Sequence, residues 1–137
     1  MRKGKDIAEH LDRIYVDLLS AYDSKGKYVK ILGLDESIRF VGRIKGSRIT
    51  SFVRRENSAP LLDEEMSNLA HYQASVKASM EEMFDSSLGK TNWMITSKEH
   101  VKLITIFLDD GLLILSMDNN GNHDQVIEKI KSLNMEI

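Results

Sequence analysis

Residues 61–88 read LLDEEMSNLAHYQASVKASMEEMFDSSL, and more than any other segment they set the architecture. Apolar side chains recur here at three- and four-residue steps, a near-heptad repeat interrupted by Gln73 that places them along one side of a helix. These side chains are Leu62, Met66, Leu69, Val76, Met80 and Met83. The acidic run at 63–65 suits the positive end of a helix dipole, and Gly89 suits a helix terminus. The segment predicts one uninterrupted helix of about 26 residues, which is about 39 Å long at about 1.5 Å per residue.

A β-hairpin is predicted on the N-terminal side of this helix. Residues 37–55, SIRFVGRIKGSRITSFVRR, alternate in character with the period of two expected of a strand. The first strand places Ile38, Phe40 and Ile44 on one side and Arg39, Val41 and Arg43 on the other. The pattern resumes from Arg48 after a tight glycine turn, and residues 57–60 break the second strand.

Three more strands are predicted after the long helix, at 92–96, 101–108 and 112–117. Asp109-Asp110-Gly111 forms the turn between the last two. LLILSM, the last strand, is apolar almost throughout, so we place it at the centre of the sheet, covered on both faces. A closing helix follows, with its apolar face formed by Val126, Ile127, Ile130 and Leu133.

The chain begins with a predicted amphipathic helix at 5–22, and a short helical piece is expected at 28–32 before Gly33. The apolar stripe of the first helix consists of Ile7, Leu11, Ile14, Tyr15, Leu18 and Tyr22. The order of elements is thus α-β-β-α-β-β-β-α, an α+β fold. We expect a single domain over 1–137, with a helical extension at 1–33 and a core at 34–137.

The composition is that of a globular protein. With 137 residues, 42% of them hydrophobic and 29% charged, the chain amounts to one domain and resembles neither a disordered nor a membrane protein. Apolar runs fall short of the roughly 18 residues that a spanning helix needs, and the first residues turn polar too early for a signal peptide. Cysteine is absent, so disulfides and thiolate sites are excluded. We expect an intracellular, cytoplasmic protein that is stabilised by packing alone.

Residues 116–125, SMDNNGNHDQ, resemble a calcium-binding loop because oxygen-bearing side chains stand at nearly every other position. An EF-hand loop counted from its aspartate needs glycine at the sixth position and glutamate at the twelfth, where this chain has His123 and Lys129. A lysine in place of the bidentate carboxylate repels the ion. The same residues fit a strand-to-helix connector, in which 119–121 support positive φ and Asn122 caps the closing helix.

Other short motifs do not point to a cofactor, a metal or a catalytic centre. Gly89-Lys90-Thr91 matches the end of a phosphate-binding P-loop, but that motif requires glycine where this chain has Phe84. It also leads from a strand into a helix, and here the order is reversed. The four histidines are scattered, without the spacing of metal ligands: His10, His71, His100 and His123. We therefore predict no catalytic residue, no bound metal and no cofactor.

Charge is distributed unevenly, although the net charge is only −2. Residues 25–55 contain nine basic and two acidic side chains, a net charge of +7, whereas residues 56–137 contain fourteen acidic side chains and six lysines, a net charge of −8. Such a split attracts an anionic partner or a second subunit, or it is simply two solvated faces. The candidate partner- or anion-binding residues of the basic hairpin are Arg39, Arg43, Arg48 and Arg54. Because the hairpin lacks an interleaved aromatic platform, an acidic protein surface fits it better than nucleic acid.

With the long helix between a two-stranded and a three-stranded segment, the chain resembles the roadblock / dynein light chain family and its profilin-like α/β fold. More narrowly, it is similar to small archaeal proteins of that type. The resemblance is carried by LDESIRFVGRI at 34–44, PLLDEE at 60–65, LGK at 88–90, HVKLITIFL at 100–108, LLILSM at 112–117 and HDQVIEKI at 123–130. It implies a five-stranded antiparallel sheet with the long helix on one face and the terminal helices on the other.

The resemblance also implies a mode of action. Proteins of this family pair as dimers through the long helix and the adjacent edge strand, and many are platforms for small Ras-like GTPases or subunits of larger assemblies. They have no catalytic residues to transfer to this chain, so we expect it not to be an enzyme. The first helix at 5–22 is longer than the family core needs, and it either covers or creates a partner surface.

Physical arguments agree with a homodimer. A helix of the predicted length has more surface than a five-stranded sheet buries, so part of it is spare for a second subunit. TNWMIT, at 91–96, is an apolar edge strand, and such an edge aggregates unless it is paired. The predicted dimer interface consists of Leu69, Val76, Met80, Trp93, Met94 and Ile95.

Three functions remain open from the sequence. The first is a homodimeric scaffold or regulator that binds a small GTPase or a larger assembly. The second is a small-molecule sensor of the PAS type, in which 61–88 would break into several short helices around a ligand cavity. The third is an acidic-surface or nucleic-acid binder that uses the basic hairpin, with steeply salt-dependent binding.

Overall fold

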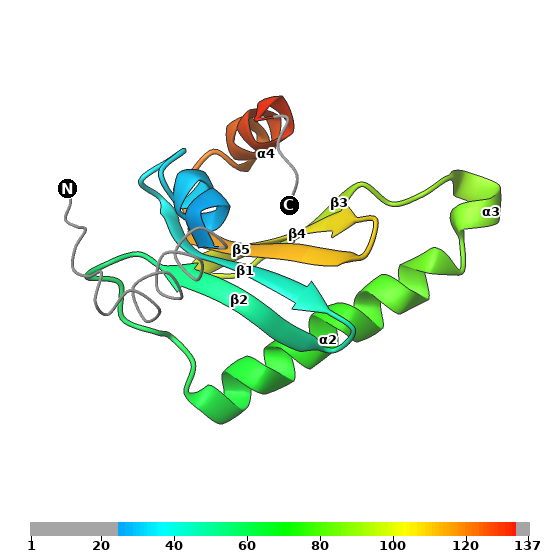
Figure 1. The fold of residues 1–137 in the computed structure, drawn as a ribbon, viewed down its shortest axis with the longest axis horizontal. Coiled ribbons are helices and arrows are strands. Elements are labelled where there is room, and N and C mark those ends of the chain that lie inside the picture. The colour runs from blue at the N-terminus through cyan, green and yellow to red at the C-terminus, as the bar shows by residue number, and fades with distance from the viewer. Residues whose placement is uncertain (1–24, 134–137) are drawn as a thin grey trace, which may run out of the picture.

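A five-stranded antiparallel sheet with helices on both faces forms the body of the protein (Figure 1). The computed structural model describes residues 25–133. The strands are β1 (Ile38–Lys45), β2 (Arg48–Arg54), β3 (Trp93–Ser97), β4 (Val101–Leu108) and β5 (Gly111–Asp118), in the spatial order β2-β1-β5-β4-β3. The predicted α+β fold class and the order of elements are confirmed. The predicted helix at 5–22 lies outside the described residues, and the division into an extension and a core stays a prediction.

Strand β5 lies at the centre of the sheet, as its apolar sequence predicted. It pairs with β1 on one side and with β4 on the other, both antiparallel. Leu113, Leu115 and Met117 point to one face and enter the larger core cluster, whereas Leu112 and Ile114 belong to the smaller cluster on the opposite face. The strand is apolar on both sides because helices cover both faces of the sheet.

The larger core lies between the sheet and the terminal helices. Residues 25–32 form a helical segment that buries Tyr28 and Ile31, and α4 (His123–Ser132) buries its apolar face of Val126, Ile127 and Ile130. Asn122 caps α4, because its side chain accepts a hydrogen bond of 3.1 Å from the backbone N–H of Gln125. The connector interpretation of 116–125 is thus confirmed, except that positive φ is not adopted at 119–121.

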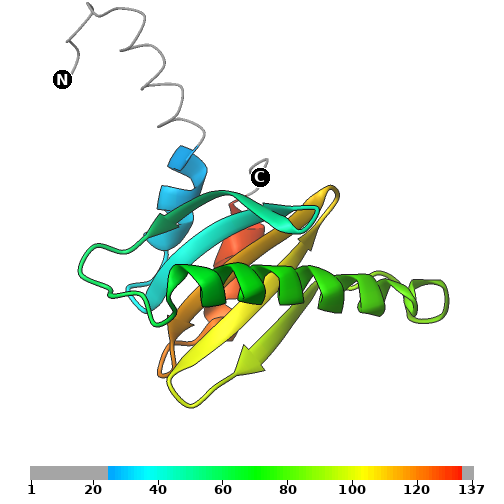
Figure 2. The same cartoon turned by 90° about the horizontal axis from the view of Figure 1, so that it is seen from below.

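The long helix α2 (Glu64–Glu82) crosses the other face of the sheet diagonally (Figure 2). Its N-cap is Asp63, whose carboxylate accepts a hydrogen bond of 2.8 Å from the backbone N–H of Met66. Ala74 and Ala78 contact the sheet, where they pack with Ile44 and Leu112 in the smaller cluster. The small side chains bring the helix close to the strands, but they bury little apolar area. None of the described helices is long and apolar enough to span a membrane.

The prediction of one uninterrupted helix over 61–88 was wrong at both ends. The helix starts only after Asp63, and it ends at Glu82, so that it has 19 residues and is about 28 Å long. Phe84 leaves helical geometry with φ −103° and ψ 1°, and a separate helix, α3 (Asp85–Leu88), follows before Gly89 at φ 88°. The break comes where α2 projects beyond the sheet (Figure 2).

The predicted sides of the first strand were also partly wrong. The pairing of β1 with β5 shifts register between Ile38 and Phe40, so these two side chains point to opposite faces. Ile38 and Val41 pack in the larger core, whereas the ring of Phe40 stacks on His71 of α2. A bulge of this kind adds one residue to the period of two, and the simple alternation therefore fails at Arg39.

Candidate interaction surface

The outer side of α2 exposes large apolar side chains. Leu69, Val76 and Met80 are 57%, 39% and 59% exposed. Successive residues of a helix are rotated by about 100°, so these three lie opposite the alanines that contact the sheet. Together with the exposed Met66 and Met83 they form the outer stripe of α2. The structure thus brings the three predicted helix residues together on one surface.

Apolar exposure continues past both ends of the outer stripe. Leu61 and Leu62 precede the helix, and Phe84 and Leu88 follow it, all of them exposed. Phe84 and Leu88 belong to the segment around α3, which projects beyond the sheet (Figure 2). Among the described residues, large apolar side chains are thus exposed along α2 and past both of its ends, which makes this side of the protein a candidate contact surface. Sequence reasoning had placed Phe84 and Leu88 inside the long helix and therefore missed them as surface residues.

Strand β3 is an edge strand next to this surface. It pairs with β4 on one side only, in the register Trp93↔Ile106 to Ser97↔Lys102, and its outer edge has no neighbouring strand among the described residues. Trp93 is 38% exposed, Met94 is half-buried, and Ile95 packs against the larger core. On β4, Leu103 is exposed as well, since α2 does not cover this corner of the sheet. Ile95 can therefore contribute to an interface through its backbone, whereas Trp93 and Met94 can contribute their side chains.

The four arginines of the hairpin do not form one cationic face. Arg43 is 2% exposed, forms an ion pair with Asp110 and donates a hydrogen bond of 3.1 Å to the carbonyl oxygen of Ile44. The hydrogen bond from Arg43, reinforced by the positive charges of Arg43 and Lys45, lowers the pKa of Asp110. Burial raises the pKa of Tyr28, with which this ion pair also interacts. Arg43 is therefore an internal residue, and its predicted placement on a partner-binding face was wrong.

The other three arginines lie in different surroundings. Arg39 forms a 3.2 Å ion pair with Asp118 and donates to the carbonyl oxygen of Ala59 at 2.9 Å. The guanidinium carbon of Arg54 lies 5.0 Å above the ring of Phe40, on the side of the sheet that carries α2. Arg48, at the start of β2, is exposed. Because these residues lie in separate surroundings, the structure does not assemble the compact anion site that their spacing suggested.

Sequence reasoning overlooked Arg55, which is the most extensively bonded arginine of the described residues. It donates to the carbonyl oxygens of Ile38 at 2.6 Å, Leu32 at 2.5 Å and Asp35 at 2.9 Å. These bonds join the helical segment 25–32 to the start of β1. Its neighbour Asp35 accepts hydrogen bonds from Ser37, which lower the pKa of the Asp35 carboxyl.

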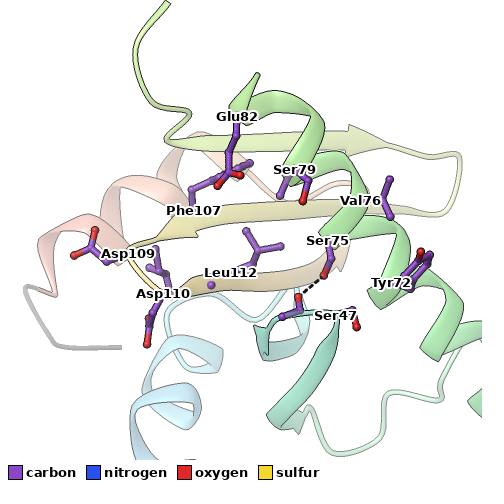
Figure 3. A pocket seen from close by; sticks show the side chains of 14 residues that line it. Ser47, Tyr72, Ser75, Val76, Ser79, Glu82, Phe107, Asp109, Asp110 and Leu112 are labelled. Carbon is purple, nitrogen blue, oxygen red and sulfur yellow. Dashed lines mark hydrogen bonds between the residues drawn. The ribbon is translucent and has the colours of Figure 1, made fainter. Parts of the chain in front are cut away.

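An open groove lies between α2 and the turns of the two hairpins (Figure 3). It has a volume of about 440 Å³, and its floor is formed by Phe107 and Leu112. One wall is closed by Ser75, whose hydroxyl donates to the carbonyl oxygen of Gly46 at 2.9 Å. Within residues 25–133, no three histidine or carboxylate side chains are grouped closely enough to hold a metal ion. The groove is open to solvent, unlike the enclosed ligand cavity that the sensor alternative required.

Comparison with known proteins adds evidence on the fold. The sequence matches no protein-family model and no curated protein. Among solved structures, the gliding protein MglB of Thermus thermophilus aligns with a TM-score of 0.68 at 12% identity, over 82% of this chain and 84% of that one. A roadblock/LC7 domain of Streptomyces avermitilis aligns with a TM-score of 0.54 at 12% identity, over 74% and 88% of the two chains. The chain has the roadblock fold.

A further roadblock-fold structure, described as MglB with a tetrameric arrangement, aligns with a TM-score of 0.61 at 14% identity, over 82% of this chain and 83% of that one. These identities are low, so the likeness concerns the fold alone. The resemblance to the roadblock family is confirmed at that level. The narrower similarity to archaeal proteins stays a prediction.

Proposed function

We propose that this roadblock-fold protein is a non-enzymatic, homodimeric scaffold or regulatory protein. The proposal is carried by two features of the described residues: the exposed outer stripe of α2 and the open edge of β3. Both are features that a soluble monomer avoids, because exposed apolar surface and unpaired strand edges promote association. A second copy of the chain covers both at once.

The two features support one geometry of pairing. Two β3 edges can pair antiparallel about a twofold axis, which joins the two sheets into one and satisfies the unpaired backbone groups. The end of α2 and all of α3 project beyond the sheet (Figure 2) and would then lie over the partner. Phe84 and Leu88, together with the uncovered Leu103, are the apolar side chains that this overlap buries.

The size of the surface supports the use of both features. A stable interface buries about 800 Å² on each partner. The outer side of a helix about 28 Å long and about 10 Å wide offers roughly 300 Å², which falls short of that value. The edge of β3 and the projecting end of α2 supply the remainder. A dimer through the helix alone is therefore the weaker arrangement.

The partner beyond the second copy is proposed from the family resemblance. Small Ras-like GTPases and larger protein assemblies are the partner classes that it implies, and MglB, described as a gliding protein, shares the fold. In the described residues the outer stripe of α2 is flanked by acidic side chains, Glu64 and Glu65 at one end and Glu81 and Glu82 at the other. A protein surface that is apolar at its centre and basic at its rim matches this pattern.

The dimer is tested by the mass of the protein in solution. We expect the wild type to be a dimer in size-exclusion chromatography with multi-angle light scattering at micromolar concentration. Met80→Glu places a charge in the outer stripe and Met94→Pro interrupts the edge strand, so each variant is expected to give monomers or aggregates. Val29→Glu is the matched control, because Val29 is 42% exposed on the opposite face, and it should remain a dimer. A monomeric wild type, or dimers in both interface variants, would contradict the proposal.

A further inference from the structure

His71 lies where α2 contacts the sheet. Its ring stacks on the ring of Phe40 in β1, with centroids 6.1 Å apart and an interplanar angle of 18°. The Nδ1 atom of His71 is buried and has no hydrogen-bond partner among the described residues. An ionisable side chain thus forms part of the helix–sheet contact, together with Ala74, Ala78 and Ser75.

The charged group near His71 is a cation, Arg54. Arg54 in β2 lies over the same Phe40 ring, at 5.0 Å, and it is the charged group of the described residues that acts on His71. From β1 and β2 the aromatic neighbours are Phe40 and Phe52, which stack on each other at 5.5 Å. One turn along α2, Ser75 already donates its hydroxyl to Gly46. No described carboxylate therefore compensates a positive charge on His71.

Protonation changes what this site must accommodate. In the neutral ring we assign the proton to Nε2, which leaves a bare lone pair on the buried Nδ1. The imidazolium has donors on both nitrogens, so protonation places an N–H where no described acceptor faces it. It also puts a second cation close to Arg54. Burial, followed by the charge of Arg54, lowers the pKa of His71 accordingly.

We propose that His71 is a proton-operated latch between α2 and the sheet, closed when its ring is neutral and released when the ring is protonated. The latch acts on α2 because the helix buries so little else: Ala78 is its one buried residue. Release loosens α2 without disrupting the larger core, which lies on the other face of the sheet. Since α2 carries the outer stripe, acidification also weakens self-association, and this consequence rests on the proposed dimer.

The lowered pKa of His71 determines how the stability of the fold changes with pH. The folded-state pKa lies below the unfolded value of about 6.5, so the folded protein binds fewer protons than the unfolded chain just below that pH. The stabilisation is complete above about pH 6.5 and is lost as the pH falls toward the folded-state pKa. The loss is at most about tenfold in the folding equilibrium constant for each pH unit.

The latch is tested with the full chain by two measurements. Histidine ring signals are followed by NMR between pH 8 and pH 5, and urea unfolding is measured over the same range. We expect His71 to titrate below pH 6.5. His71→Phe keeps a ring but cannot be protonated, so its folding equilibrium constant should not show the decrease on acidification, at most about tenfold per pH unit, that is expected of the wild type. His100→Gln is the control at an exposed position and should retain the wild-type pH dependence. Titration of His71 above pH 6.5, or equal pH dependence in the wild type and His71→Phe, would overturn the latch.

Two additions keep the result decisive. His71→Gln provides a second non-titrating side chain if phenylalanine does not fit, and the NMR titration needs no substitution to give its answer. Sedimentation at pH 7.5 and pH 5.5 then separates the two proposals. A monomeric wild type at pH 7.5 refutes the dimer but leaves the unfolding test intact. A dimer that dissociates on acidification equally in the wild type and in His71→Phe refutes the regulatory role of the latch while the dimer stands.

Discussion

Replacement of Gly111 by alanine is the perturbation whose effect the structure defines best. Gly111 starts β5 at φ 149°, a conformation that L-residues rarely adopt. A Cβ atom there would lie 2.2 Å from the carbonyl oxygen of Ile44 and 2.5 Å from Nη1 of Arg43. The first of these atoms belongs to the backbone of the neighbouring strand and cannot move aside. The second donates a hydrogen bond to that same carbonyl oxygen, and the other terminal nitrogen of the guanidinium holds the ion pair with Asp110.

The magnitude has two parts. Backbone strain of a non-glycine residue in this region costs about 1–3 kcal/mol, and forcing extra volume into a packed site costs about 1–3 kcal/mol more. We therefore expect Gly111→Ala to lose about 3 kcal/mol of unfolding free energy. Gly46→Ala is the matched control, since Gly46 also has positive φ, 64°, but a Cβ atom there meets nothing within 4 Å. It should lose about 1 kcal/mol, the backbone part alone.

Urea unfolding followed by circular dichroism measures both values. With a slope of about 2 kcal/mol per molar urea, the midpoint should fall by about 1.5 M for Gly111→Ala and by about 0.5 M for Gly46→Ala. Equal shifts in the two variants would refute the reasoning, because they would show that the β4–β5 turn does not press against β1.

Three further substitutions test separate parts of the structure. Arg55→Met removes the three bonds to backbone carbonyls and should cost about 2–3 kcal/mol in urea unfolding, whereas a neutral result would mean that the helical segment 25–32 is held by packing alone. Asp63→Ala removes the cap of α2 and should cost about 1 kcal/mol; Asp63→Asn, which can still accept the bond, is its control. Asp110→Asn tests a pH dependence. The pKa of Asp110 is lowered in the folded state, so its contribution to the unfolding free energy is complete above about pH 3.9 and is lost as the pH falls below that value. The variant should therefore be less stable than the wild type at pH 6, and its unfolding free energy should decrease less between pH 6 and pH 3. Identical losses on acidification in the two proteins would speak against the Arg43–Asp110 pair.

The features that could be predicted from the sequence are those set by neighbouring residues. The apolar run at 112–117 identified the central strand because a strand covered on both faces has no polar side. Asn122 identified the start of α4 because a cap acts within three residues of the chain, as its bond to Gln125 does. The turn at Asp109-Asp110-Gly111 was found for the same reason.

The features that were missed depend on residues far apart in the sequence. Arg43 reads as an exposed charge until Asp110, 67 residues away, is brought beside it. The end of α2 at Glu82 lies where the helix projects beyond the sheet, and the apolar repeat within 61–88 continues past it to Met83. The bulge at Arg39 is a property of the pairing of β1 with β5 and cannot be seen in β1 alone.

The same distinction explains why the outer stripe of α2 points to a partner. A near-heptad repeat of large apolar residues shows that one side of a helix is buried, but it does not show against what. In an ordinary surface helix that side faces its own sheet. Here the sheet is contacted by Ala74 and Ala78, and the large residues Leu69, Val76 and Met80 face away from it. Within residues 25–133 the repeat therefore has no partner in the fold, and this is the observation on which the proposed second molecule rests.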